Sequence, residues 1–106
     1  MHPDTQSAFR ALADPTRRDI LQILARGDRT IAEVADRFEM TRPAIKKHLT
    51  ILAQGRLIDV VPRGRERINK LRNNGLFPVL HWLSELDAAW DDRLSALKSA
   101  IEKDSR

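Results

Sequence analysis

Two groups of basic side chains are the residues best suited to chemistry, and the chemistry they offer is recognition of an anionic partner. The first group lies in the segment TRPAIKKHLTIL, residues 41–52, and the second lies near residue 65. Helical spacing would place Ile45, Leu49 and Leu52 on one apolar stripe of the first segment. The basic residues fall mostly off that stripe, so the outward face suits an anionic groove. The pattern alone also fits an ordinary solvated helix, so the neighbouring segments must decide.

The sequence holds no set of residues typical of an enzyme. It contains no Ser/His/Asp arrangement, no glycine loop that would cradle a phosphate and no acid pair in a recognisable cleft. Asp91 and Asp92 are expected on a solvated helix face. The chain has no cysteine, which excludes disulfides, thiolate metal sites and a cysteine nucleophile. We therefore predict a protein that is not an enzyme and that needs no cofactor.

Composition and charge favour a small nucleic-acid-binding domain. The 106 residues are 42% hydrophobic, which predicts one globular domain over residues 1–106. No signal peptide core or apolar run of membrane length is present, so we expect a cytoplasmic protein that contacts no membrane. Residues 41–72 carry nine basic and two acidic side chains, whereas residues 1–40 and 73–106 have net charges of −1 and −2. Such a concentrated basic block is expected for a nucleic-acid footprint.

The first half of the chain predicts four helices, and the last two form a helix-turn-helix over residues 30–54. A short helix is expected at residues 5–12, and Asp14-Pro15 predicts the start of a second helix. Thr30 and Glu33 have the spacing of a capping box at the start of the third helix. A tight connection then leads to Thr41, which caps the fourth helix, and Gly55 is expected to end it in a left-handed conformation. In a helix-turn-helix the second helix enters the DNA major groove.

A β-hairpin with a basic tip is predicted over residues 57–71. Residues 57–61 and 66–71 are rich in β-branched side chains, and Gly64 lies in the turn between them. Arg63, Arg65 and Arg67 cluster at the tip, from which they can reach phosphates or a minor groove. A charged hairpin could also serve solubility alone. Its position directly after a helix-turn-helix favours a wing.

A long final helix is predicted over residues 78–103, and its apolar spacing favours dimerisation. The apolar residues recur at alternating steps of three and four, which is a heptad-like seam. A core helix with a solvated end would be the simpler alternative. Because a rod of nearly 40 Å is too long for so small a domain to cover, we expect the seam to meet a second copy. The seam consists of Val79, Leu83, Leu86, Trp90, Leu94, Leu97 and Ile101.

These elements together resemble a winged helix-turn-helix regulator of the arsenic-repressor (ArsR) family, in its cysteine-free branch. The resemblance rests on LADPTRRDILQILARG at residues 12–27, TRPAIKKHLTILAQGRLI at residues 41–58 and AAWDDRLSALKSAIE at residues 88–102. It implies a mainly α fold with a small β hairpin and a long C-terminal dimerisation helix. It also implies a homodimeric, sequence-specific transcriptional repressor with a double-stranded DNA operator as partner.

The resemblance assigns candidate residues to two surfaces. The fourth helix would read the operator, the wing would touch the backbone, and the first and last helices would form the dimer interface. The candidate DNA-binding residues are Thr41, Arg42, Pro43, Lys46, Lys47, His48, Thr50, Arg63, Arg65 and Arg67. The candidate interface adds Phe9 and Leu12 to the seam of the last helix.

Departures from the family pattern concern its metal sites. Members that sense thiophilic metals carry a Cys-x-Cys pair where this chain has Thr30 and Ala32. On the last helix the chain has only His81, with Glu85 one turn on, which is too few ligands for a closed site. His48 lies at a position where the family usually has His. We expect it to contact a DNA phosphate or to pack against the protein, and not to bind a metal. We therefore predict no metal.

Two other functions remain possible from the sequence. One is a metal- or ligand-responsive repressor with an unusual site near His81, which zinc binding would reveal. The other is a winged-helix module that binds another protein, which weak and salt-independent DNA binding would favour. The basic middle block argues against the second alternative.

Overall fold

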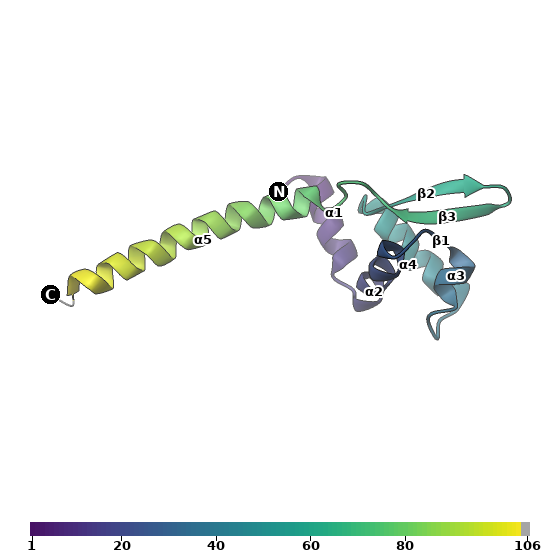
Figure 1. The fold of residues 1–106 in the computed structure, drawn as a ribbon, viewed down its shortest axis with the longest axis horizontal. Helices are drawn as coiled ribbons and strands as arrows, with labels where there is room; N and C mark the ends of the chain where they lie inside the picture. Colours follow the sequence, from purple (N-terminus) through teal and green to yellow (C-terminus); the bar gives the residue numbers. More distant parts are fainter. Residues whose placement is uncertain (105–106) are drawn as a thin grey trace.

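The computed structural model describes residues 1–104, in which short helices pack against a small sheet and one long helix projects away from them (Figure 1). The fold is mainly α with a β hairpin, as the sequence predicts. Its elements are α1 (Pro3–Leu12), α2 (Pro15–Ala25), β1 (Arg29–Thr30), α3 (Ile31–Ala35), α4 (Arg42–Gln54), β2 (Ile58–Arg63), β3 (Glu66–Leu71) and α5 (Phe77–Asp104).

Capping residues fix where the helices of the domain begin. The Asp14 carboxylate accepts the Arg17 amide at 3.1 Å, and the Thr41 hydroxyl accepts the Ala44 amide at 3.3 Å. At α3 the Thr30 hydroxyl accepts the Glu33 amide, and the Glu33 carboxylate accepts the Thr30 amide. Each bond satisfies a first-turn donor that has no helical partner. All three predicted starts are thus confirmed, including the capping box.

The hydrophobic core lies where α2, α3 and α4 meet the base of the sheet. Its largest fully buried side chains come from four elements, which explains why the short helices hold together although each is marginal alone. α3 is shorter than expected because it ends at Ala35, and Phe38 packs against the core from the following turn. The largest fully buried side chains are those of Ile20, Val34, Ile45, Leu52 and Ile58.

The sheet has the order β1-β3-β2, with both pairings antiparallel. β2 and β3 form the predicted hairpin, although β2 runs two residues further towards the tip than expected. Pro62 fits in β2 because this is an edge strand, where a missing N–H need not break a ladder. β1 was not predicted. It pairs Arg29 with Asn69, and the buried Asn69 side chain donates to the Arg29 carbonyl oxygen at 3.2 Å.

The predicted left-handed cap at Gly55 is wrong. Gly55 has φ −76°, and the left-handed residue is Arg56 with φ 59°. The glycine answers a steric demand instead, because a Cβ there would lie 3.0 Å from the Ala11 Cβ and 3.0 Å from the Ser7 carbonyl oxygen. Gly55 therefore permits the close approach of α1 to the end of α4.

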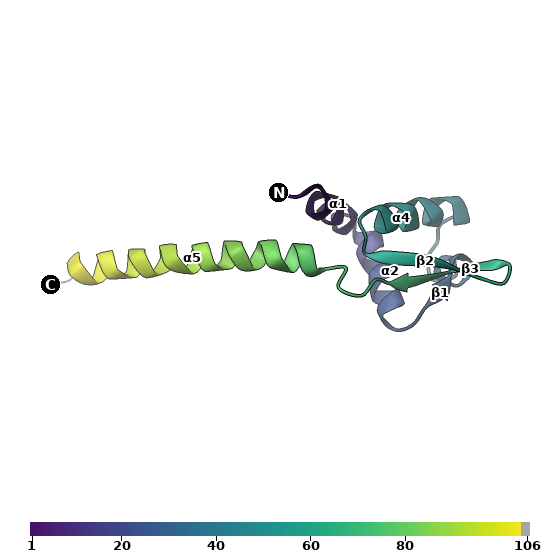
Figure 2. The ribbon, with the colours of Figure 1, turned by 90° about the horizontal axis from the view of Figure 1, so that it is seen from above.

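α5 leaves the domain as a rod (Figures 1 and 2). Its 28 residues span about 42 Å at 1.5 Å each, within a molecule whose longest dimension is 72 Å. α1 packs against its first turns, where the rings of Phe9 and Trp82 meet edge to face with centroids 5.4 Å apart. Within residues 1–104, no helix is both long and apolar enough to cross a membrane.

Candidate nucleic-acid interface

α4 separates an apolar inner face from a basic outer face. Ile45, Leu49 and Leu52 are buried in the core, and this fixes the rotation of the helix. The helix therefore presents its polar residues to solvent, and the Thr50 hydroxyl donates back to the Lys46 carbonyl oxygen at 2.9 Å. The exposed candidates on or beside this helix are Thr41, Arg42, Pro43, Lys46, Lys47 and Thr50.

His48 differs from the other candidates on α4, because it faces the start of α2. Its Nδ1 lies 3.4 Å from an Arg17 guanidinium nitrogen and 3.8 Å from an Asp14 carboxylate oxygen. The same guanidinium donates to the carbonyl oxygens of Ala11 and Arg10 at 2.8 and 3.0 Å. Of the two roles expected for His48, this environment favours packing over a phosphate contact.

The Asp14 carboxylate caps α2 and lies 3.8 Å from His48 of α4. Desolvation raises its pKa, but the Arg17 amide hydrogen bond and the charges of Arg17 and His48 outweigh that effect, so the pKa of Asp14 is lowered. The Asp14 carboxylate is therefore ionised at neutral pH, where it caps α2 and faces His48. Through these contacts α4 is positioned by both α1 and α2.

The wing carries its arginines into solvent at the end of the molecule away from α5 (Figures 1 and 2). Arg63 and Glu66 are the last pair of residues in register between β2 and β3, and Gly64 has φ 63° in the turn between them. Glycine suits this left-handed position because it lacks a Cβ. Arg63, Arg65 and Arg67 are all exposed, so the tip offers several cations on a short, rigid support.

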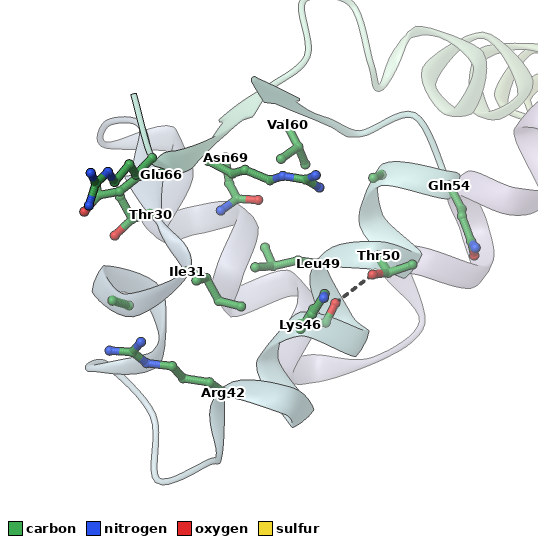
Figure 3. A pocket seen from close by; sticks show the side chains of 14 residues that line it. Thr30, Ile31, Arg42, Lys46, Leu49, Thr50, Gln54, Val60, Glu66 and Asn69 are labelled. Carbon is green, nitrogen blue, oxygen red and sulfur yellow. Dashed lines mark hydrogen bonds between the residues drawn. The ribbon is translucent and has the colours of Figure 1, made fainter. Parts of the chain in front are cut away.

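A concave surface joins α4 to the wing, and we name it the wing cavity (Figure 3). Its volume is about 810 Å³. The sequence grouped Arg42 and Lys46 with one element and Arg65 and Arg67 with another, and the fold brings these four to one hollow. The sequence did not predict the third wall, because the position of its residues beside the wing depends on the tertiary fold. That wall is formed by Thr30, Ile31 and Ala32, which line the cavity together with Asn69 of β3.

The dimer candidates divide into two groups in the protomer. Phe9 and Leu12 are half-buried and pack against the core. Val79 was expected on the exposed seam, but it is 5% exposed and belongs to the protomer's own core, because α5 still lies on the domain there. The rest of the seam is exposed along α5, at Leu83, Leu86, Trp90, Leu94, Leu97 and Ile101.

The residues considered for a metal do not form a site with three or more ligands within residues 1–104. His81 Nε2 lies 2.9 Å from a Glu85 carboxylate oxygen, and the His81 ring stacks on Phe77. At the third-helix position the Thr30 hydroxyl is engaged in the helix cap, and Ala32 has no ligand atom. Within the described residues no group of three or more histidine or acidic side chains could hold a metal ion.

The basic face of α4 and the arginine-tipped hairpin beside it define a DNA-binding protein of the winged helix-turn-helix class. A helix-turn-helix domain family matches residues 12–61. The transcriptional repressor SdpR of Bacillus subtilis is 35% identical over 77 residues, covering 73% of this chain and 86% of that protein. The HTH-type transcriptional regulator Rv2034 of Mycobacterium tuberculosis is 34% identical over 97 residues, covering 92% of this chain and 88% of that protein.

Solved structures agree with these sequence relatives. The ArsR-like transcriptional regulator from Rhodococcus sp. RHA1 superimposes with a TM-score of 0.80 at 36% identity, covering 91% of each chain. The chain belongs to the ArsR family of winged helix-turn-helix transcriptional regulators, as the sequence resemblance suggested. The family consists of regulators of transcription and not of enzymes.

Proposed function

We propose that the protein is a homodimeric repressor that inserts α4 into the major groove of its operator and lays the wing on the backbone. The observation that supports this proposal best is that Arg42, Lys46 and Lys47 are exposed on α4, outside its buried stripe. The major groove accepts one helix and presents a donor and acceptor pattern that Arg and Lys can read. The operator is the protein's partner, and a cytoplasmic location follows from that role.

The exposed seam of α5 supports the homodimer. Closed assemblies of identical chains are most often two-fold dimers. A dimer with two-fold symmetry should bind an operator with the same symmetry. Its half-sites would lie about one helical turn apart, or a multiple of that spacing. We propose repression and not activation because the relative SdpR is named as a transcriptional repressor.

Selection of genomic fragments tests this function directly. Fragments bound by the intact protein are enriched over several rounds and sequenced, and the enriched site is placed upstream of a reporter. We expect a two-fold motif, binding that weakens with salt, and lower reporter output when the protein is present. Weak binding without salt dependence or sequence enrichment would instead favour a protein-interaction module.

Metal ions should not act as inducers through the family's third-helix position. Thr30 and Ala32 offer no thiolate, and His81 has one carboxylate beside it. Zinc or arsenite at micromolar levels should therefore leave the operator complex intact in a mobility-shift titration. Release by zinc that is lost in His81→Ala would establish the alternative, a metal-responsive repressor with a site near His81.

A further inference from the structure

The floor of the wing cavity is apolar, which contact with a phosphate backbone does not explain. Ile31 of α3, Leu49 and Ala53 of α4, and Val60 of β2 all line it. Figure 3 shows Ile31 and Leu49 on one side of the hollow, with Val60 and Asn69 on the sheet across from them. Val60 is 39% exposed and Leu49 only 5%, so apolar surface runs from the core outwards into the cavity. A polar partner would gain little from covering it.

The rim of the same cavity is basic. Arg42 and Lys46 stand on the α4 side, and Arg65 and Arg67 on the wing, against the single acid Glu66. Within residues 1–104, none of these four cations has an ion pair with a carboxylate. The cavity thus combines an apolar interior with unpaired positive charge at its mouth.

We propose that the wing cavity binds a small amphipathic organic acid, whose apolar body covers the floor and whose carboxylate meets the cations of the rim. Ligand sites typically enclose about 300–1,000 Å³ with mostly apolar walls and a few polar groups that fix orientation, and the volume of about 810 Å³ falls in that range. Arginine pairs with carboxylates through parallel hydrogen bonds.

The acid would regulate DNA binding by direct competition, and this part rests on the proposed function. Arg42, Lys46, Arg65 and Arg67 are the same cations that we assign to DNA. A carboxylate held among them lowers the positive charge offered to the operator, and an apolar body in the hollow occupies the space between α4 and the wing. Ligand and operator would therefore exclude each other without any change of fold.

Calorimetric titration of the intact protein without DNA tests the site. The probe is decanoate, kept well below the concentration at which it forms micelles, with decan-1-ol and acetate as controls. We expect saturable binding of decanoate and much weaker binding of both controls, because each control lacks one half of the required chemistry. Absence of saturable decanoate binding, or equal binding of decan-1-ol, would overturn the proposal.

Val60 and Val61 provide a matched pair of variants. They are neighbours in β2 and equally exposed, at 39% each, but only Val60 lines the cavity. Val60→Glu places a carboxylate against the floor and should weaken decanoate binding by about tenfold or more. Val61→Glu makes the same change in net charge and should retain the wild-type affinity. Equal affinity in the two variants would refute the assignment to this cavity.

Two further measurements keep the test independent of folding and of DNA binding. If Val60→Glu does not fold, contacts between labelled decanoate and the Val60 and Ala53 methyl groups of the wild type are sought by nuclear magnetic resonance. Their absence at saturation would exclude the cavity. Operator binding by the wild-type protein is measured separately, without decanoate. If the protein does not bind DNA there, the proposed function fails but the ligand site does not. Operator release by decanoate then tests the competition, and its absence despite binding would refute the regulatory role.

Discussion

At the scale of single residues, Lys46 is the side chain that we expect to reach the base edges if α4 docks as proposed. It lies one turn into α4, it is exposed, and it flanks the buried stripe that fixes the rotation of the helix. One well-formed Lys or Arg contact to guanine contributes about 1–3 kcal/mol of discrimination. The specificity of the protein should therefore respond strongly to this one side chain.

Replacing Lys46 with Ala should weaken operator binding by about 1–3 kcal/mol and leave the thermal unfolding temperature nearly unchanged. Fluorescence anisotropy with operator and with scrambled DNA measures both affinity and specificity. Lys98→Ala is the matched control, because it removes the same charge from an exposed position on α5. Unchanged operator affinity in Lys46→Ala, and in Arg42→Ala and Lys47→Ala, would contradict the docking of α4.

Glu33 makes the start of α3 sensitive to acid. Its backbone and side-chain hydrogen bonds from Thr30 lower the pKa of Glu33 below the ordinary value of 4.5. A carboxyl with a lowered pKa in the folded state stabilises the fold above its unfolded pKa, and that contribution is lost as pH falls through the folded pKa. The stabilisation should therefore be complete at neutral pH and decline below about pH 4.5.

Glu33→Gln separates this effect from the rest of acid unfolding. Glutamine keeps an acceptor for the capping box but does not titrate. The unfolding temperature of the wild type should exceed that of Glu33→Gln at pH 7, and the difference should shrink as the pH falls below about 4.5. A difference that stays constant from pH 7 to strongly acidic solution would contradict the assigned role of the carboxylate.

Residues whose role is local could be predicted from the sequence in full, whereas those whose role depends on tertiary contacts could be predicted only in part. The caps at Asp14, Thr30 and Thr41 act within three residues of themselves, so spacing alone identifies them. The need for a glycine at position 55 comes from Ala11 and Ser7 on another helix. His48 likewise owes its orientation to Arg17 and Asp14 of α2, which no local pattern contains.

At the scale of elements, the wing and α4 should contribute differently to DNA binding. The wing arginines are held on a hairpin whose strands are tied by six residue pairs from Ile58–Leu71 to Arg63–Glu66. Their exposed guanidinium groups suit phosphates, which lie along every sequence, whereas base edges differ between sequences. Removal of a wing arginine should thus lower affinity without changing sequence preference.

Arg65→Ala should weaken binding to operator and scrambled DNA by the same factor. Removing one cation that neutralises a phosphate should reduce the slope of log affinity against log salt by about one. Affinities measured over a series of salt concentrations give that slope, with Lys98→Ala again the charge-matched control. Full affinity with an unaltered slope would exclude Arg65 from the interface, and a loss of affinity confined to the operator would show base reading instead.

The type and order of the longer elements could be predicted from the sequence, but the shortest strand could not. Hydrophobic periodicity indicated α2, α4 and α5, and β-branched side chains indicated both strands of the hairpin, because each of these elements is long enough to show its pattern. β1 has two residues, and two residues cannot display alternation. The wing cavity could not be predicted for a different reason, since it forms only where residues of α3, α4 and the sheet come together in the fold.

At the scale of the whole molecule, the basic DNA-binding candidates and the exposed seam of α5 lie at opposite ends. The basic wing and α4 occupy one end, and α5 extends from the other (Figure 1). From residue 83 onwards the α5 seam is exposed, whereas Val79 still belongs to the protomer core. Pairing through α5 would therefore leave the DNA-binding surface free on both copies, and it would hold two α4 helices at a fixed separation.

Trp90 is the side chain on which we expect this pairing to depend most. It is 61% exposed in the protomer, and aromatic side chains supply large contact areas. Residues at the centre of an interface often cost at least about 2 kcal/mol when truncated, and a factor of ten corresponds to about 1.4 kcal/mol. Trp90→Ala should thus weaken dimerisation by more than about tenfold and reduce operator binding with it.

Sedimentation velocity at micromolar concentration, followed by operator titration, measures both effects. Ser95→Ala serves as the control, because Ser95 is exposed on the same helix but off the seam. It should leave the sedimentation coefficient of a dimer unchanged. A monomer of Trp90→Ala can occupy only one half-site, so its operator affinity should approach that for a single half-site. A monomeric wild type would contradict the assignment of α5 to dimerisation, as would a fully dimeric Trp90→Ala that binds its operator normally.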